Sequence, residues 1–223
     1  MTRPYRLSVE QFVSHFRGQL AQISKVPSEQ FRQTLYCLIL DPLATAAYHK
    51  AGSRKNAVRL IRELSGWTDA ERVSRLQLRL ALLEYGFAKG SLYQEVAKRL
   101  RRQPTIGGTP LSASPLLHEL QAHAGTSDER HILERCTYSQ LFYTYRSNLV
   151  HEFRLPGYQT DWGRGSMEPY YGESAFDRYQ LVFPVGFVAR IAENSLQNLE
   201  AYLLANKIAP HSKFEFGSLW RWQ

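Results

Sequence analysis

The chain has 223 residues, of which 43% are hydrophobic and 22% charged, enough for a core in one domain or in one domain with an extension. Its net charge of +8 favours a polyanionic partner, either nucleic acid or a membrane surface, and says nothing about the fold. No stretch approaches the roughly 18 apolar residues of a membrane span, and no apolar run of signal-peptide length opens the chain. The two distant cysteines, Cys37 and Cys136, indicate buried thiols in a reducing compartment, so we expect a cytoplasmic protein without membrane contact.

The first hundred residues carry helical patterns, in which apolar residues recur every three or four positions. Ser8 is the expected cap of the first helix, and Asp41 followed by Pro42 is expected to start a new one. Thr68 and Asp69 are expected to cap a long helix. The predicted helices cover 8–24, 31–40, 41–52, 54–65, 68–87 and a segment that ends at 98–102.

Three of these helices carry clusters of basic residues. Two interpretations stay open, a solvated helix face and a phosphate-binding surface. Because few acidic residues lie near them, a phosphate-binding surface is slightly favoured. The clusters are Arg54, Lys55, Arg59 and Arg62; a ridge of Arg72, Arg75 and Arg79; and residues 98–102.

Residues 103–115, rich in Gly, Pro, Ser and Thr, form the clearest linker. They divide the expected helical region 1–103 from a helical bundle over 104–223, although both can belong to one compact domain. Gly107-Gly108 lacks the Gly-Lys-Ser/Thr of a phosphate-binding loop. His118 and His123 do not share a helix face, and no other ligands accompany them, so we expect no metal site.

The chain is organised around a predicted helix over 130–154. Its apolar stripe, which should face a core, comprises Tyr138, Phe142, Tyr145, Leu149 and Phe153. Arg146 lies about 40° from the centre of that stripe and His151 about 180° from it. The face around His151 carries Thr144, Ser147 and Asn148. Short hydrogen-bonding groups around a histidine indicate a surface that meets a ligand or partner.

Arg146 and His151, separated by four residues near the end of an amphipathic helix, resemble the motif of the HEPN superfamily. Many of its members are metal-independent endoribonucleases of toxin–antitoxin, CRISPR and phage-defence systems. A polar residue usually follows the arginine, and here Ser147 takes that place, with Asn148 next. The resemblance covers about residues 115–208. It implies an all-α, HEPN-like bundle, a homodimer in which two such helices form a composite cleft, and an antitoxin or defence-system protein as a possible partner.

Residues 155–178 form the longest irregular stretch, and a loop of this length is often functional. Arginines interleaved with aromatic rings suit phosphate contact and base stacking in single-stranded RNA. The alternative, that the rings fix the loop to the bundle, is favoured for Trp162. The expected RNA-binding residues are Arg154, Tyr158, Arg164, Tyr170 and Tyr171. A small hairpin is possible near 168–183, and Pro184 should start a last helix.

The chemistry that this motif can perform needs no cofactor. Histidine can donate or accept a proton near neutral pH, and arginine matches phosphate oxygens with a planar fork. His151 is therefore the expected acid and base, and Arg146 the expected stabiliser of the phosphoryl charge. Asn148 or Ser147 would orient them. Two alternatives stay open: a non-catalytic HEPN-like module that binds RNA or an antitoxin, and a helical regulator that binds DNA through its basic helices.

Overall fold

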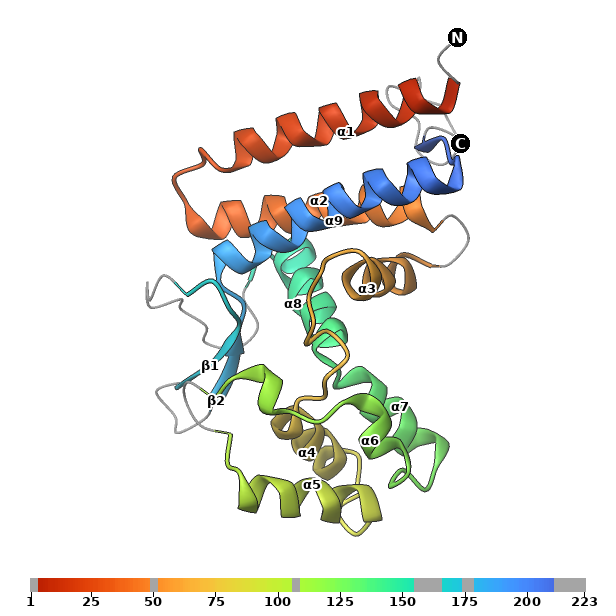
Figure 1. Cartoon of the computed structure of the whole chain (residues 1–223). Coiled ribbons are helices and arrows are strands. Elements are labelled where there is room, and N and C mark those ends of the chain that lie inside the picture. Colours follow the sequence, from red (N-terminus) through yellow and green to blue (C-terminus); the bar gives the residue numbers. More distant parts are fainter. Residues whose placement is uncertain (1–3, 49–51, 106–108, 155–165, 174–178, 211–223) are drawn as a thin grey trace, which may run out of the picture. The chain divides into compact units, whose positions relative to one another are not determined.

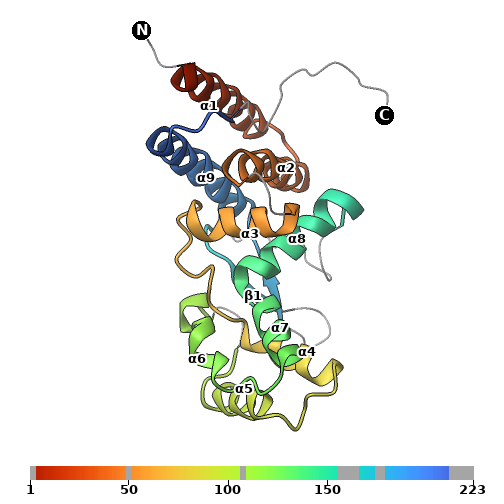
Figure 2. The same ribbon diagram turned by 90° about the vertical axis from the view of Figure 1, so that its right-hand side faces the viewer.

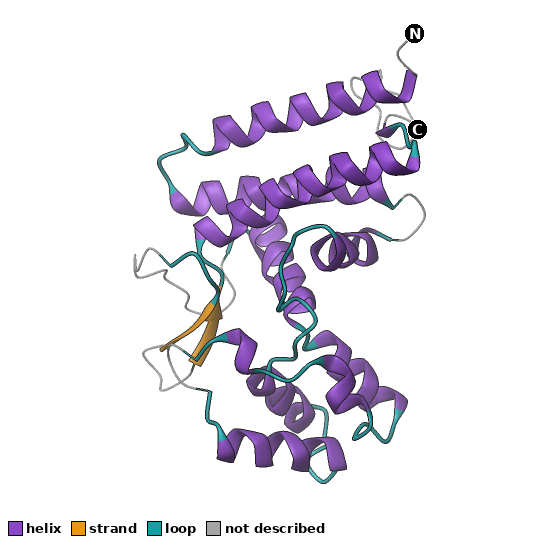
Figure 3. Ribbon diagram, viewed as in Figure 1, coloured by secondary structure: helices purple, strands orange, loops and turns teal. Residues whose placement is uncertain are grey.

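The computed structural model describes residues 4–48, 52–105, 109–154, 166–173 and 179–210. Helices dominate these residues, accompanied by one small hairpin (Figure 3). The predicted mostly helical fold with a small hairpin is therefore confirmed. The elements in chain order are α1 (Pro4–Ile23), α2 (Glu29–Ala47), α3 (Ser53–Glu63), α4 (Arg75–Glu84), α5 (Ser91–Arg102), the 3₁₀ turn η1 (Leu111–Ala113), α6 (Leu117–Gln121), α7 (Ser127–Arg135), α8 (Tyr138–Glu152), β1 (Tyr170–Glu173), β2 (Tyr179–Val182) and α9 (Val185–Asn206).

The chain forms two compact units, one from Met1–Gly66 with Val188–Gln223 and one from Trp67–Phe187. This division differs from the expected one at residue 104. The reason is that residues on both sides of the expected linker share one core, so the linker separates elements of a single unit. The fully buried members of this core include Leu78, Leu82, Leu92 and Val96 before the linker, and Leu120 and Leu133 after it.

The first unit, called the terminal unit below, contains α1, α2, α3 and most of α9. Helices α1, α2 and α9 lie side by side in both views (Figures 1 and 2). Two side-chain amides of α9 close the end of α3: Asn198 donates to the carbonyl of Leu64 over 2.8 Å, and Asn194 donates to that of Ser65 over 3.2 Å. These bonds satisfy carbonyl groups that a helix end leaves without an intrahelical donor.

Helix boundaries in the terminal unit differ from the expected ones at two points. Helix α1 begins at Pro4, so Ser8 lies inside it. Helix α2 continues through Pro42 to Ala47, and the expected new start at Asp41 is wrong. A proline inside a helix costs about 3 kcal/mol because it removes a hydrogen bond and crowds the preceding turn. Burial of Leu43, Ala44, Ala46 and Ala47 offsets that cost.

In the second unit, called the central unit below, two expected helix spans are wrong for one shared reason. Helix α4 begins at Arg75 rather than near Thr68, and residues 130–154 form two helices, α7 and α8. The backbone of residues 70–74 pairs with residues 136–139. Residues 70–74 therefore stay outside α4, and the chain leaves the helical conformation at residues 136–137. The Ser74 N–H donates to the Cys136 carbonyl over 3.0 Å, and the Tyr138 N–H donates to the Arg72 carbonyl over 2.9 Å.

Strands β1 and β2 pair antiparallel, with Tyr170 opposite Val182 and Tyr171 opposite Leu181. The hairpin therefore lies where the sequence predicts it. Among the described residues, no helix combines the length and the apolar character that crossing a membrane requires. Cys37 and Cys136 are both buried free thiols, as predicted. Burial raises the pKa of Cys136 to about 12, which makes its thiol unreactive at neutral pH.

Candidate nucleic-acid interface on helix α8

An aromatic cluster within the central unit positions helix α8. The Phe142 ring lies 5.1 Å from that of Phe183 and 5.9 Å from that of Phe187. The Tyr145 ring also lies 5.1 Å from Phe183, and the Trp67 ring lies 4.9 Å from Phe187. These contacts confirm that the stripe of Tyr138, Phe142, Tyr145 and Leu149 is buried.

Phe153 does not belong to this stripe, contrary to the prediction. Helix α8 ends at Glu152, and Phe153 adopts the left-handed conformation with φ 51°. Its backbone N–H donates to the carbonyl of Asn148, which ends the helix, while its ring remains 50% exposed. The expected extension of the helix through Arg154 is therefore wrong.

The opposite face of α8 is polar, as the sequence predicts. Thr144 and His151 are exposed, and Ser147 and Asn148 are half-buried. The Thr144 hydroxyl donates to the Gln140 carbonyl over 3.1 Å, so it is engaged within the helix. His151 lies in the last turn of α8, next to the exposed ion pair between Glu152 and Arg154. A ligand could reach His151 and Arg154 without rearrangement of the helix.

Arg146 has a different environment from His151. Only 4% of Arg146 is exposed, and its guanidinium carbon lies 5.9 Å from the centre of the Tyr143 ring. Its expected place on the flank of the apolar stripe is confirmed. One copy of α8 does not bring Arg146 and His151 together, because positions five residues apart diverge by about 140° around a helix.

The two hairpin tyrosines that were expected to bind RNA differ in their exposure to solvent. Tyr170 is half-buried, whereas Tyr171 is 2% exposed and points into the central unit. Base stacking by Tyr171 does not fit this structure, because its ring is covered. Arg154 is exposed, and Tyr158, Arg164 and Trp162 lie outside the described residues.

A buried chain of hydroxyl groups surrounds Tyr171. Its hydroxyl lies 2.7 Å from the Ser74 hydroxyl and 3.2 Å from that of Tyr138, which in turn lies 2.8 Å from the Ser114 hydroxyl. Burial raises the pKa of both Tyr138 and Tyr171 above the ordinary value. Sequence patterns did not reveal this cluster, because its members come from four separate segments.

The predicted basic ridge of Arg72, Arg75 and Arg79 does not exist. Arg72 precedes α4, Arg75 is 3% exposed and Arg79 is exposed. On α3, Arg59 pairs with Glu63 over 2.7 Å and covers the Tyr48 ring at 4.2 Å. Within the described part of the chain, no group of three or more His, Cys, Asp or Glu could hold a metal ion.

Comparisons of this chain with protein-family models, with curated proteins and with solved structures found no match.

Proposed function

We propose that the chain is a metal-independent endoribonuclease of the HEPN type, cutting single-stranded RNA at a site formed by two copies of α8. The observation that carries the proposal is that one continuous helix, α8, carries Arg146, Asn148 and an exposed His151. The net charge of +8 supports an RNA substrate.

The reaction begins with attack of the RNA 2′-oxygen on the adjacent phosphorus. As the new oxygen–phosphorus bond forms, the bond from phosphorus to the 5′-oxygen of the next nucleotide breaks. The 2′-hydroxyl loses a proton and the leaving 5′-oxygen gains one, so the products carry a 2′,3′-cyclic phosphate and a 5′-hydroxyl. His151 moves a proton in this step, and Arg146 stabilises the charge on the phosphoryl oxygens. Asn148 or Ser147 orients His151 or the phosphate.

The test is cleavage of a labelled RNA in EDTA, followed by analysis of the product ends. His151→Ala should slow cleavage by about 10²- to 10⁴-fold, the usual contribution of general acid–base catalysis. His131→Ala is the matched control, because His131 is an exposed histidine on the neighbouring helix α7. Cleavage that requires a metal, or that is equally fast in His151→Ala, contradicts the mechanism.

A second test addresses Arg146, whose burial makes Arg146→Ala a risk to folding. Arg146→Lys retains the positive charge and most of the side-chain volume but not the planar fork. A folded Arg146→Lys that retains RNA binding and loses cleavage supports the role in charge stabilisation. A folded Arg146→Lys with unchanged cleavage contradicts that role.

A non-catalytic module that binds RNA or an antitoxin is the second candidate. The observation that favours it is the burial of Arg146 next to Tyr143, which suits a structural role. Wild-type protein that binds RNA but cleaves none of a panel of unstructured RNAs would favour this candidate. The RNA-binding and cleavage assays are repeated with an added toxin–antitoxin or defence-system partner protein, to compare the two candidate functions in its presence.

A further inference from the structure

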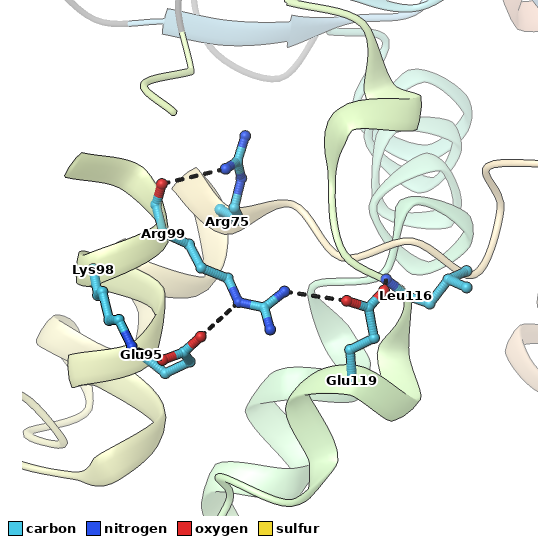
Figure 4. A network of polar contacts seen from close by, with 6 residues as sticks. All are labelled: Arg75, Glu95, Lys98, Arg99, Leu116 and Glu119. Carbon is cyan, nitrogen blue, oxygen red and sulfur yellow. Dashed lines mark hydrogen bonds and ion pairs between the residues drawn. The ribbon is translucent and has the colours of Figure 1, made fainter. Parts of the chain in front are cut away.

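A polar pocket of about 470 Å³ lies in the central unit, and its described lining residues do not include any of α8. It is bordered by the start of α4, the last turns of α5 and the backbone of residues 112–115. Its charged side chains are Arg72, Arg75, Arg99, Arg102, Glu95 and Glu119, and Figure 4 shows several of them. Guanidinium groups therefore outnumber carboxylates along its walls.

Two of these arginines are already paired. The Arg99 side chain donates to Glu95 over 2.8 Å and to Glu119 over 3.2 Å (Figure 4). Arg72 donates to Asp69 over 2.9 Å and to the Ser114 carbonyl over 2.7 Å. These bonds fix one wall of the pocket before any ligand arrives.

Arg75 is different, because it is a buried cation with unused donors. It is 3% exposed, and its Nη1 makes only a long bond of 3.5 Å to the Arg99 carbonyl. Its Nε and Nη2 are buried and have no hydrogen-bond partner among the described residues. No carboxylate of those residues pairs with it either. Burial lowers the pKa of Arg75, the nearby Tyr138 and Tyr171 act against this shift, and Arg99 adds to it. An arginine nevertheless stays charged in proteins.

A buried charge without a counter-charge is strongly unfavourable, since desolvation takes away the hydrogen bonds that water would give. Arg102 adds an exposed guanidinium at the pocket, also without a carboxylate partner in the described part of the chain. Both arginines line the pocket, so an anion seated there would bring a negative charge near Arg75 and would offset its unfavourable burial.

We propose that this pocket binds a phosphate group carried by a molecule of nucleotide size. A phosphate offers several acceptor oxygens, which suits arginines that line one pocket from two helices. The pocket is larger than a phosphate ion needs and lies in the usual range for small-molecule sites, so the rest of the ligand also fits. The phosphate can belong to a free nucleotide or to the end of a polynucleotide. The site does not depend on catalysis by α8.

The binding test uses calorimetry on the full chain in a chloride buffer of constant ionic strength. We expect heat of binding with inorganic phosphate and with adenosine 5′-monophosphate, and none with adenosine. A short oligoribonucleotide with a 5′-phosphate is compared with the same oligoribonucleotide ending in a 5′-hydroxyl. A preference for the phosphorylated end assigns a polynucleotide source, and binding of the mononucleotide alone assigns a small molecule. Absence of binding by every phosphate-bearing ligand overturns the proposal.

Two pairs of variants locate the site. Arg102→Gln changes a pocket residue and Arg101→Gln its exposed neighbour, so both remove one charge without disturbing the core. Arg75→Gln and Arg79→Gln form a second pair on α4. The pocket variants should weaken phosphate binding by about 10- to 100-fold, the range for loss of a charged hydrogen-bonding partner.

The controls Arg101→Gln and Arg79→Gln should bind almost as wild type. Equal weakening in pocket variants and controls would mean general attraction to a basic surface, and it overturns the proposal. If Arg75→Gln fails to fold, the exposed pair at 101 and 102 still decides the question. RNA cleavage is measured separately on the same variants, so failure of this site and failure of the α8 mechanism are distinguished.

Discussion

Charged and polar side chains of the central unit differ widely in their exposure to solvent, as Arg75, Arg146 and His151 show. Arg75 and Arg146 are both almost fully buried, whereas His151 is exposed at the end of α8. The sequence predicted a place for Arg146 on the flank of an apolar stripe, and it predicted a basic surface ridge for Arg75. The helical spacing used for Arg75 assumed a helix from Thr68, whereas in the structure the buried face of α4 comprises Arg75, Leu78 and Leu82.

The buried hydroxyl cluster allows a prediction at the residue scale. Tyr171→Phe removes one hydroxyl that contacts Ser74 and Tyr138, while each of these residues keeps another partner. We expect the free energy of unfolding to fall by about 1 kcal/mol, the net contribution of a typical hydrogen bond. Tyr85→Phe, at a position 64% exposed, should change it by less than about 0.5 kcal/mol. Urea unfolding measures the free energy of unfolding of both variants. Equal losses in Tyr171→Phe and Tyr85→Phe would show that the hydroxyl cluster does not stabilise the central unit.

At the scale of elements, the start of α7 depends on one buried carboxylate. Glu129 is 3% exposed, and its Oε2 accepts from the N–H groups of Gly125 over 2.8 Å and Thr126 over 3.1 Å. Glu129→Ala leaves these donors without their partner and should lower the free energy of unfolding by about 1–3 kcal/mol. Glu134→Ala, exposed on the same helix, is the control. Thermal unfolding that is unchanged in Glu129→Ala would contradict this role.

The contact between α5 and α6 should depend on pH. The pKa of Glu95 is lowered from its ordinary value, chiefly because Arg99 donates to it, and that of Glu119 is lowered first by the Leu116 N–H and then by Arg99. Carboxylates with a lowered pKa in the folded state stabilise it above their ordinary pKa, and they lose this contribution as the pH falls through the lower value.

Arg99→Gln should therefore have a lower free energy of unfolding than wild type at pH 7. The difference between the two proteins should shrink as the pH falls. The difference at pH 7 should be below about 1 kcal/mol, because solvent screens these partly exposed groups. Urea unfolding at pH 7, 5 and 3 measures the trend, and Arg101→Gln controls for loss of a basic charge. A difference that grows as the pH falls would have the opposite sign to this expectation.

Most helices could be predicted from the sequence because their apolar periodicity is strong. Two of the wrong helix spans lie where distant backbone segments pair. Nothing in residues 130–154 signals the break at Thr137, since the break arises from bonds to residues 70–74. In α2, packing of Leu43 and Ala44 overrides the local signal of Pro42. For the candidate site, spacing predicted the polar face of α8, and it could not predict that Tyr171 is covered.

At the scale of the molecule, the proposed composite site predicts a homodimer with two α8 helices facing each other. The reason is the divergence of Arg146 and His151 around a single helix. Sedimentation at micromolar concentration should give about twice the chain mass of 25.7 kDa. A monomer in the absence of any partner would count heavily against the composite site, while leaving the arginine pocket unaffected.

The terminal unit uses residues from both sides of the central unit, which has a consequence for synthesis. Residues 67–187 are complete before most of α9 leaves the ribosome, so the central unit can fold during translation. Helices α1 to α3 are made first, yet their unit is finished last, because it lacks α9 until the end. Until α9 is made, apolar residues of these early helices that pack in the finished unit stay exposed, and exposed apolar surface makes a folding intermediate prone to aggregation.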